Sequence, residues 1–326
     1  MAIFLSSLGL VAALAQVPTV SPTPTAAPDS LSALRSRIAQ DSGDGSSWYL
    51  LGLALLRSDF EAHSHHTPGD TTTAQAVLDT ADLAFRRAAT LLAGTRRGDS
   101  ARVFHVFTWG RRALWAWETG GMEAAAGRWS TAPEDVRLPA VLEELGENLL
   151  RACPTGGVLL VRAGPDAQAA TYLRMARHLR TDLTVVPYEV WRVDSMLQTR
   201  VMRDLGAPPA THGEDPGTGL AGVAAKRRLC AEMGLEKPPD LPAAGGGRHG
   251  RMTWKAHALV WVSGAGQQAD TVPPQDFVFA ALRLALDAND PWAAPAVQVY
   301  RHAAELTPGL CPTLSGFGVK DAVGCR

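Results

Sequence analysis

The chain has 326 residues, of which 46% are hydrophobic and 19% are charged, and this composition is typical of a folded globular protein. Its formal net charge of −1 at pH 7 excludes the strongly basic surface with which proteins bind nucleic acid or anionic membranes. We therefore expect about two modest domains and no nucleic-acid partner.

The N-terminal segment is apolar and uncharged. It closes with Ala13-Leu14-Ala15, the small-x-small pattern that a leader peptidase recognises, although no Lys or Arg precedes it. We expect residues 1–15 to be a signal peptide or a retained membrane anchor, the alternative being an amphipathic or buried helix. Residues 16–28 are rich in Pro and Thr and predict an extended linker. The protein is then exported, periplasmic or otherwise extracytoplasmic, with membrane contact through this segment.

Helical periodicity dominates residues 29–137. Two patterns in this region, W-x2-L-G and A-x3-F followed by a small residue, are formed by Trp48, Leu51, Gly52, Ala81, Phe85 and Ala88. With these patterns the segment resembles a tetratricopeptide repeat, although Leu55 stands where an aromatic residue is usual. The resemblance implies a helical hairpin that stacks with others and binds proteins. Compared with the usual repeat, roughly 17 additional residues fall around 58–73.

A looser second copy is predicted over 104–129, where Ala125 and Trp129 repeat the A-x3-F spacing with Trp in place of Phe. About three repeats are needed to bury the apolar faces, so this short array must pack against the C-terminal half or against another protein. The tryptophans of the region have two interpretations, as core or as an aromatic surface that binds a partner. The candidate partner-binding residues are Trp109, Trp115, Trp117 and Trp129.

The additional residues of the first repeat are rich in His and acidic side chains. His63, His65 and His66 lie between Asp59 and Asp70, and imidazoles in this spacing are candidate ligands for a transition metal. The alternative is a solvated surface loop, because no further ligands accompany them at helical i, i+4 spacing.

After residue 138 the pattern changes to alternating strands and helices. Residues 158–161 are continuously apolar and predict a buried strand. A helix over 167–179 and a strand over 183–188 follow, and this order predicts a right-handed parallel unit. Further elements are predicted as helices over 140–152, 194–205, 222–233 and 275–288 and as a strand over 256–262. The predicted fold class is α+α/β: tetratricopeptide-like helical repeats, then a small three-layer α/β domain over 138–308 with a mostly parallel sheet.

Part of this domain carries a second set of motifs. They comprise an Asn-Leu-Leu pattern, an apolar strand, a Gly/Asp loop, a Tyr-Leu helix and an Arg-x-Asp strand, formed by Asn148, Gly157, Gly164, Asp166, Tyr172, Arg180, Asp182 and Trp191. Residues 143–205 thereby resemble the soluble C-terminal domain of bacterial O-mannosyltransferase-like membrane proteins. Glycosyl transfer in that family takes place in a multi-spanning part that has no counterpart here, so the resemblance implies no catalytic residue.

The loop after the first predicted strand is the candidate ligand site. Gly164 and Asp166 lie at the carboxyl end of a parallel strand and near the start of a helix, where free backbone N–H groups favour anionic groups. In the alternative interpretation Asp166 only caps the helix.

The four cysteines form no CxxC pair and no zinc-binding spacing. In an oxidising compartment, a disulfide between Cys311 and Cys325 would restrain the Gly-containing tail over 309–326. We predict this bridge.

The sequence contains no GxSxG, HExxH or GxxxxGK[ST] motif, and it predicts no catalytic residue and no cofactor. The leading hypothesis is a non-catalytic extracytoplasmic scaffold or accessory subunit that binds protein partners of a membrane or cell-envelope complex. The alternative is an envelope enzyme or small-ligand-binding protein that uses the α/β domain.

Overall fold

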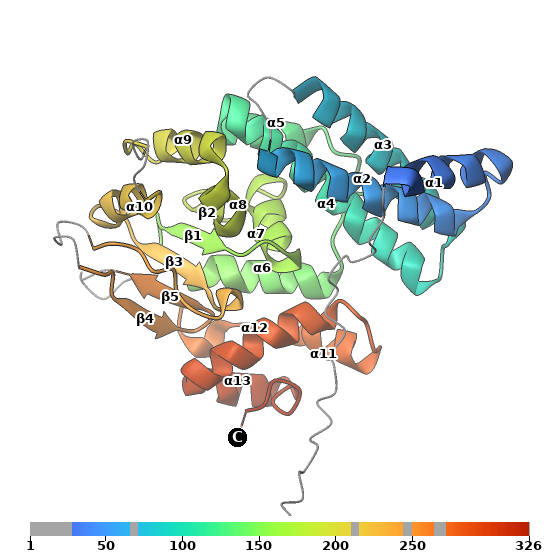
Figure 1. The fold of residues 1–326 in the computed structure, drawn as a ribbon. Helices are drawn as coiled ribbons and strands as arrows, with labels where there is room; N and C mark the ends of the chain where they lie inside the picture. Colours follow the sequence, from blue (N-terminus) through green and yellow to red (C-terminus); the bar gives the residue numbers. More distant parts are fainter. Residues whose placement is uncertain (1–27, 66–70, 210–214, 244–249, 264–271, 326) are drawn as a thin grey trace, which may run out of the picture.

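The computed structural model describes residues 28–65, 71–209, 215–243, 250–263 and 272–325 (Figure 1). The predicted leader and nearly all of the predicted linker lie outside these ranges. The described part begins with helices that pack on one another in chain order: α1 (Pro28–Gln40), α2 (Gly45–His65), α3 (Thr71–Leu91), α4 (Arg96–Gly120) and α5 (Met122–Ser130).

Local sequence signals explain where these helices meet and end. A Cβ atom at Gly52 would lie 2.7 Å from the Phe85 ring, so the glycine permits the close approach of α2 and α3. The N-cap of α4 is Thr95, whose hydroxyl accepts the Gly98 N–H at 3.2 Å. The helix ends at Gly121, whose φ of 87° is a left-handed conformation that glycine adopts readily. Of the residues 58–73, the described ones are helical, since α2 continues to His65 and α3 begins at Thr71, and residues 66–70 lie outside the described part.

The second half contains a five-stranded mixed sheet within the described ranges. Its strands are β1 (Val158–Val161), β2 (Thr184–Pro187), β3 (Leu229–Glu232), β4 (Trp254–His257) and β5 (Val260–Ser263), in the order β2-β1-β3-β5-β4. The pairs β1/β2 and β1/β3 are parallel, and the pairs β3/β5 and β4/β5 are antiparallel. The predicted parallel unit is present, but the sheet is mixed rather than mostly parallel.

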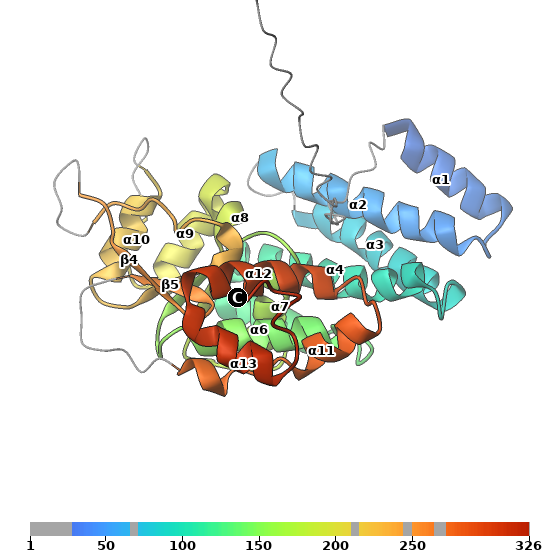
Figure 2. The same cartoon turned by 90° about the horizontal axis from the view of Figure 1, so that it is seen from below.

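Helices and 3-10 turns surround the sheet. They are α6 (Ala140–Ala152), α7 (Pro165–Met175), α8 (Tyr188–Val193), α9 (Ser195–Asp204), α10 (Gly217–Ala224), η1 (Met233–Leu235), η2 (Pro274–Asp276), α11 (Ala280–Asp287), α12 (Ala293–Leu306), η3 (Pro308–Leu310) and α13 (Cys311–Gly316). Figure 2 shows α11, α12 and α13 on the side of the sheet domain that carries α6.

Three predicted elements were wrong in detail. The predicted helix over 222–233 is instead the end of α10 followed by strand β3. The predicted strand over 256–262 is a hairpin of β4 and β5, because Ala258 turns the chain with a φ of 49°. The predicted helix over 275–288 starts later, at Ala280, after the turn η2.

The two halves of the chain pack together through one continuous hydrophobic core. Helix α4 contacts α7 and α9, and α5 also contacts α7. The contact between α4 and α9 includes a polar anchor, since the Trp117 indole N–H donates to Asp204 Oδ2 at 2.8 Å. The short helical array therefore packs against the C-terminal half of its own chain.

Candidate functional site

The sheet has a topological switch point beside β1. The chain leaves β1 through α7 to reach β2 on one side, whereas β3 pairs with β1 on its other side. In open α/β sheets the connections diverge at such a point and leave a crevice at the carboxyl ends of the strands, where ligands bind. This edge of the sheet is therefore the first place to look for a site.

A large cavity opens at this edge. It has a volume of about 1450 Å³ and lies between α2 and α4 on one side and α7, α11 and α12 on the other; we call it the groove. Its walls are mainly apolar and include Leu53, Leu56, Phe60, Phe107, Leu114 and Trp292. The apolar character is that of pockets that bind small organic molecules, and the volume exceeds their usual range of about 300–1,000 Å³, so a ligand of that kind would fill only part of the groove.

The floor of the groove is formed by the loop that follows β1. Arg162, Ala163 and Gly164 line it, and the loop is held by acidic side chains from neighbouring elements. The Ala163 N–H donates to Glu189 Oε2 at 2.8 Å, and Glu189 is the second residue of α8. Glu236, which is exposed and follows η1, also lines the groove.

Two further acidic side chains are fully buried beneath this loop. Asp166 Oδ2 accepts the Arg162 Nε–H at 2.6 Å, and Glu232 Oε1 accepts the Arg162 backbone N–H at 2.5 Å. Gly234 leaves room for them, because a Cβ atom there would lie 2.8 Å from Asp166 Oδ2. We call Arg162, Asp166 and Glu232 the floor cluster.

Glu232 is the least satisfied member of the floor cluster. Its Oε2 atom is buried and has no hydrogen-bond partner among the described residues. Burial, together with the neighbouring charge of Asp166, raises the pKa of the Glu232 carboxyl well above its usual range. Buried groups with perturbed titration beside a crevice are typical of functional sites.

The predicted ligand edge lies partly on this site. Gly164 lines the groove, and Asp166 lies directly beneath it as the second residue of α7, with Gly164 as N-cap. Sequence reasoning missed Arg162, Glu189 and Glu232. Each of these residues is at or just past the carboxyl end of a parallel strand, and this position is the signal that could have identified them. For Glu232 the signal is hidden, because the sequence pattern predicts a helix over 222–233.

The four candidate partner-binding tryptophans are interior residues. Trp109, Trp115, Trp117 and Trp129 are at most 6% exposed, so the core interpretation applies and their rings present no surface to a partner. Two of them donate hydrogen bonds to buried aspartates. The Trp115 indole N–H donates to Asp59 at 2.9 Å, and that of Trp109 donates to Asp82 at 2.9 Å.

The described part of the predicted metal-binding segment, up to His65, is helical. His63 and His65 belong to the last turn of α2, and His66 lies outside the described residues. Asp59 is buried and accepts a hydrogen bond from Arg111 Nε at 2.7 Å, so it is not part of a solvated loop. In the described part of the chain, no group of three or more His, Cys, Asp or Glu residues is placed to hold a metal ion.

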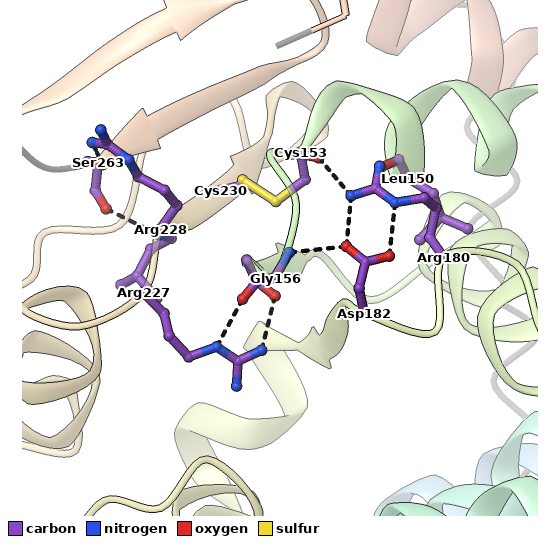
Figure 3. Close-up of a disulfide and its surroundings, with 11 residues drawn as sticks. Leu150, Cys153, Gly156, Arg180, Asp182, Arg227, Arg228, Cys230 and Ser263 are labelled. Carbon is purple, nitrogen blue, oxygen red and sulfur yellow. Dashed lines mark hydrogen bonds and ion pairs between the residues drawn. A yellow bond between two sulfur atoms is a disulfide. The ribbon is translucent and has the colours of Figure 1, made fainter. Parts of the chain in front are cut away.

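All four cysteines form disulfides. The predicted bridge between Cys311 and Cys325 is confirmed, and a second joins Cys153 to Cys230. Figure 3 shows this second bridge between the end of α6 and strand β3. Arg180 braces the same region, since it donates to the Leu150 and Cys153 carbonyls and to Asp182. Its hydrogen bonds lower the pKa of the Asp182 carboxyl to about 2.

Comparisons with known proteins found no match: no protein family, no curated protein and no solved structure is significantly similar to the chain. Among the described residues, none of the helices combines the length and apolar character of a membrane span.

Proposed function

We propose that the protein binds a small, largely apolar organic ligand in the groove. The observation that supports this most directly is the coincidence of a cavity of about 1450 Å³ with the switch point of the sheet. Of the two functions predicted from the sequence, this favours the small-ligand-binding protein.

The groove offers the ligand two chemical environments. The walls from α2, α4 and α12 provide aliphatic and aromatic contacts, for example Leu56, Phe107 and Trp292. The floor provides polar groups, namely the guanidinium of Arg162, whose side chain is 21% exposed, and the carboxylate of Glu236. A ligand with an apolar body and one polar end fits this distribution.

The test is a thermal-shift screen of the full chain against fatty acids, apolar amines and short apolar peptides. Ala294 lines the groove and is half-buried, so Ala294→Trp should fill part of it and remove the stabilisation by any hit. Ala33→Trp on the exposed surface of α1 is the matched control and should keep that stabilisation. Stabilisation that persists in Ala294→Trp would place the ligand elsewhere and contradict the proposal.

The second candidate is the extracytoplasmic scaffold that binds partners of a membrane or envelope complex. It is supported by the hairpin of α2 and α3, in which Gly52 contacts Phe85 as the tetratricopeptide resemblance implies. Two disulfides are compatible with an extracytoplasmic compartment. A pull-down from membranes followed by mass spectrometry tests this role, and a monomer that captures no partner would contradict it.

A further inference from the structure

The floor cluster contains an imbalance of charge. Asp166 and Glu232 are both 0% exposed, and Arg162 is the one basic side chain that pairs with them among the described residues. Two buried carboxylates beside one guanidinium would leave one uncompensated negative charge in the interior. Such a charge is costly, so one carboxyl is expected to keep its proton.

The hydrogen bonds identify which carboxyl holds this proton. Asp166 uses both oxygens as acceptors: Oδ2 accepts from Arg162 and Oδ1 accepts the Ala167 N–H at 3.1 Å. Glu232 uses Oε1 alone, and its Oε2 has no partner among the described residues. The ionised form is therefore better stabilised on Asp166, and the neutral form is assigned to Glu232.

We propose that Glu232 is a positioning residue of the groove: its proton keeps Arg162 paired with Asp166 in the floor, so that ligand binding in the groove weakens when this proton is lost. The proposal rests on the proposed function, because it concerns the affinity of the same groove. It adds a linkage between ligand binding and protonation.

The connection from Glu232 to the groove is short. Its Oε1 accepts the N–H of the first residue of the loop that lines the floor. When Glu232 ionises, the Arg162 guanidinium is attracted by a second buried anion, and its ion pair with Asp166 is no longer the single favoured arrangement. The floor then changes shape and gains negative charge beneath an apolar cavity.

The charged groups that act on Glu232 come from three neighbouring elements. Arg162 follows β1, Asp166 lies on α7, and Glu189 lies on α8. On strand β5 the residue paired with Glu232 is the apolar Val260. Glu189 is exposed and adds a further negative charge that favours the neutral form of Glu232.

The experiment measures binding of the neutral fluorescent dye N-phenylnaphthylamine to the full chain as a function of pH. In the wild type, the affinity for the dye should fall about tenfold for each pH unit above the pKa that Glu232 has in the dye-free protein. The decrease should stop at the pH at which the dye complex also loses this proton. In Glu232→Gln, which mimics the neutral carboxyl, the affinity should stay high and change little with pH. Glu134→Gln is the control, because it removes an exposed carboxylate that neither lines the groove nor acts on Glu232, and its pH dependence should match that of the wild type.

Three outcomes decide the proposal. A pH dependence that is the same in Glu232→Gln as in the wild type overturns it. Dye that binds equally to Ala294→Trp and to the wild type is not in the groove and counts against both this proposal and the proposed function. If no dye binds at all, the groove hypothesis fails. The protonation of Glu232 is then tested separately, because Glu232→Gln should remove part of the pH dependence of thermal unfolding if Glu232 holds a proton.

Discussion

The buried carboxylates of Asp59 and Asp82 in the helical half are more completely hydrogen-bonded than that of Glu232 in the sheet half. In the helical half, Asp59 is bound by Trp115 and Arg111, and both of its carboxylate oxygens are used. Asp82 is likewise bound on both oxygens, by Trp109 and His105 on one and by Arg86 on the other. In the sheet half, Glu232 is completely buried but has one oxygen without a partner among the described residues.

The difference separates a structural role from a functional one. A fully bonded buried carboxylate fixes the packing of the elements around it, here α2, α3 and α4. A buried carboxylate with an unpaired oxygen lowers the stability of the fold, and such groups are found mainly at functional sites. Under our proposal, the helical half forms a fixed wall of the groove and the floor is its responsive part.

The largest expected effect concerns the disulfide of the sheet half. Cys153 and Cys230 are separated by 77 residues in the sequence, and replacing both with Ser should lower the free energy of unfolding by about 4.5 kcal/mol, because the unfolded chain regains a long loop. The double Ser variant of Cys311 and Cys325, with a separation of 14, should lose about 3 kcal/mol. Urea denaturation measures both, and equal losses would contradict the dependence on loop length.

The second effect tests the helical half. Asp59→Ala leaves the buried Arg111 and Trp115 without their acceptor and should cost about 4 kcal/mol in urea denaturation. The control is Asp99→Ala, which removes the partner of Arg102, because these side chains are 57% and 50% exposed and the pair should contribute less than about 1 kcal/mol. Similar losses in the two variants would show that Asp59 is not the structural anchor described here.

The smallest effect tests the floor. Because the pKa of Glu232 is raised in the folded state, the folded chain keeps a proton that the unfolded chain releases once the pH exceeds about 4.3. The stability of the wild type relative to Glu232→Gln should therefore fall as the pH rises above this value, by at most about 1.4 kcal/mol per pH unit, and level off above the folded pKa.

Thermal and urea unfolding at several pH values measure this difference. For Glu134→Gln, which removes an exposed carboxylate that does not act on Glu232, the free energy of unfolding should depend on pH as in the wild type. A constant difference between Glu232→Gln and the wild type at every pH would contradict a proton held by Glu232.

Much of the local structure could be predicted from the sequence. The amphipathic helix over 140–152 and the apolar strand over 158–161 agree with α6 and β1 residue for residue. Strand β3 was missed because its four residues are all buried, so neither the alternation of a strand nor the period of a helix distinguishes them. Missing β3 also hid Glu232.

The sequence by itself determined the elements that short-range patterns specify, the bridge between Cys311 and Cys325, and Gly164 and Asp166 as a candidate edge. Tertiary structure alone decided that the tryptophans are buried, that the helical half packs on its own C-terminal half, and that Arg162, Asp166 and Glu232 form one cluster. The physical reason is that burial and charge pairing depend on which strands lie side by side. That order is set by packing over the whole core and not by any local pattern.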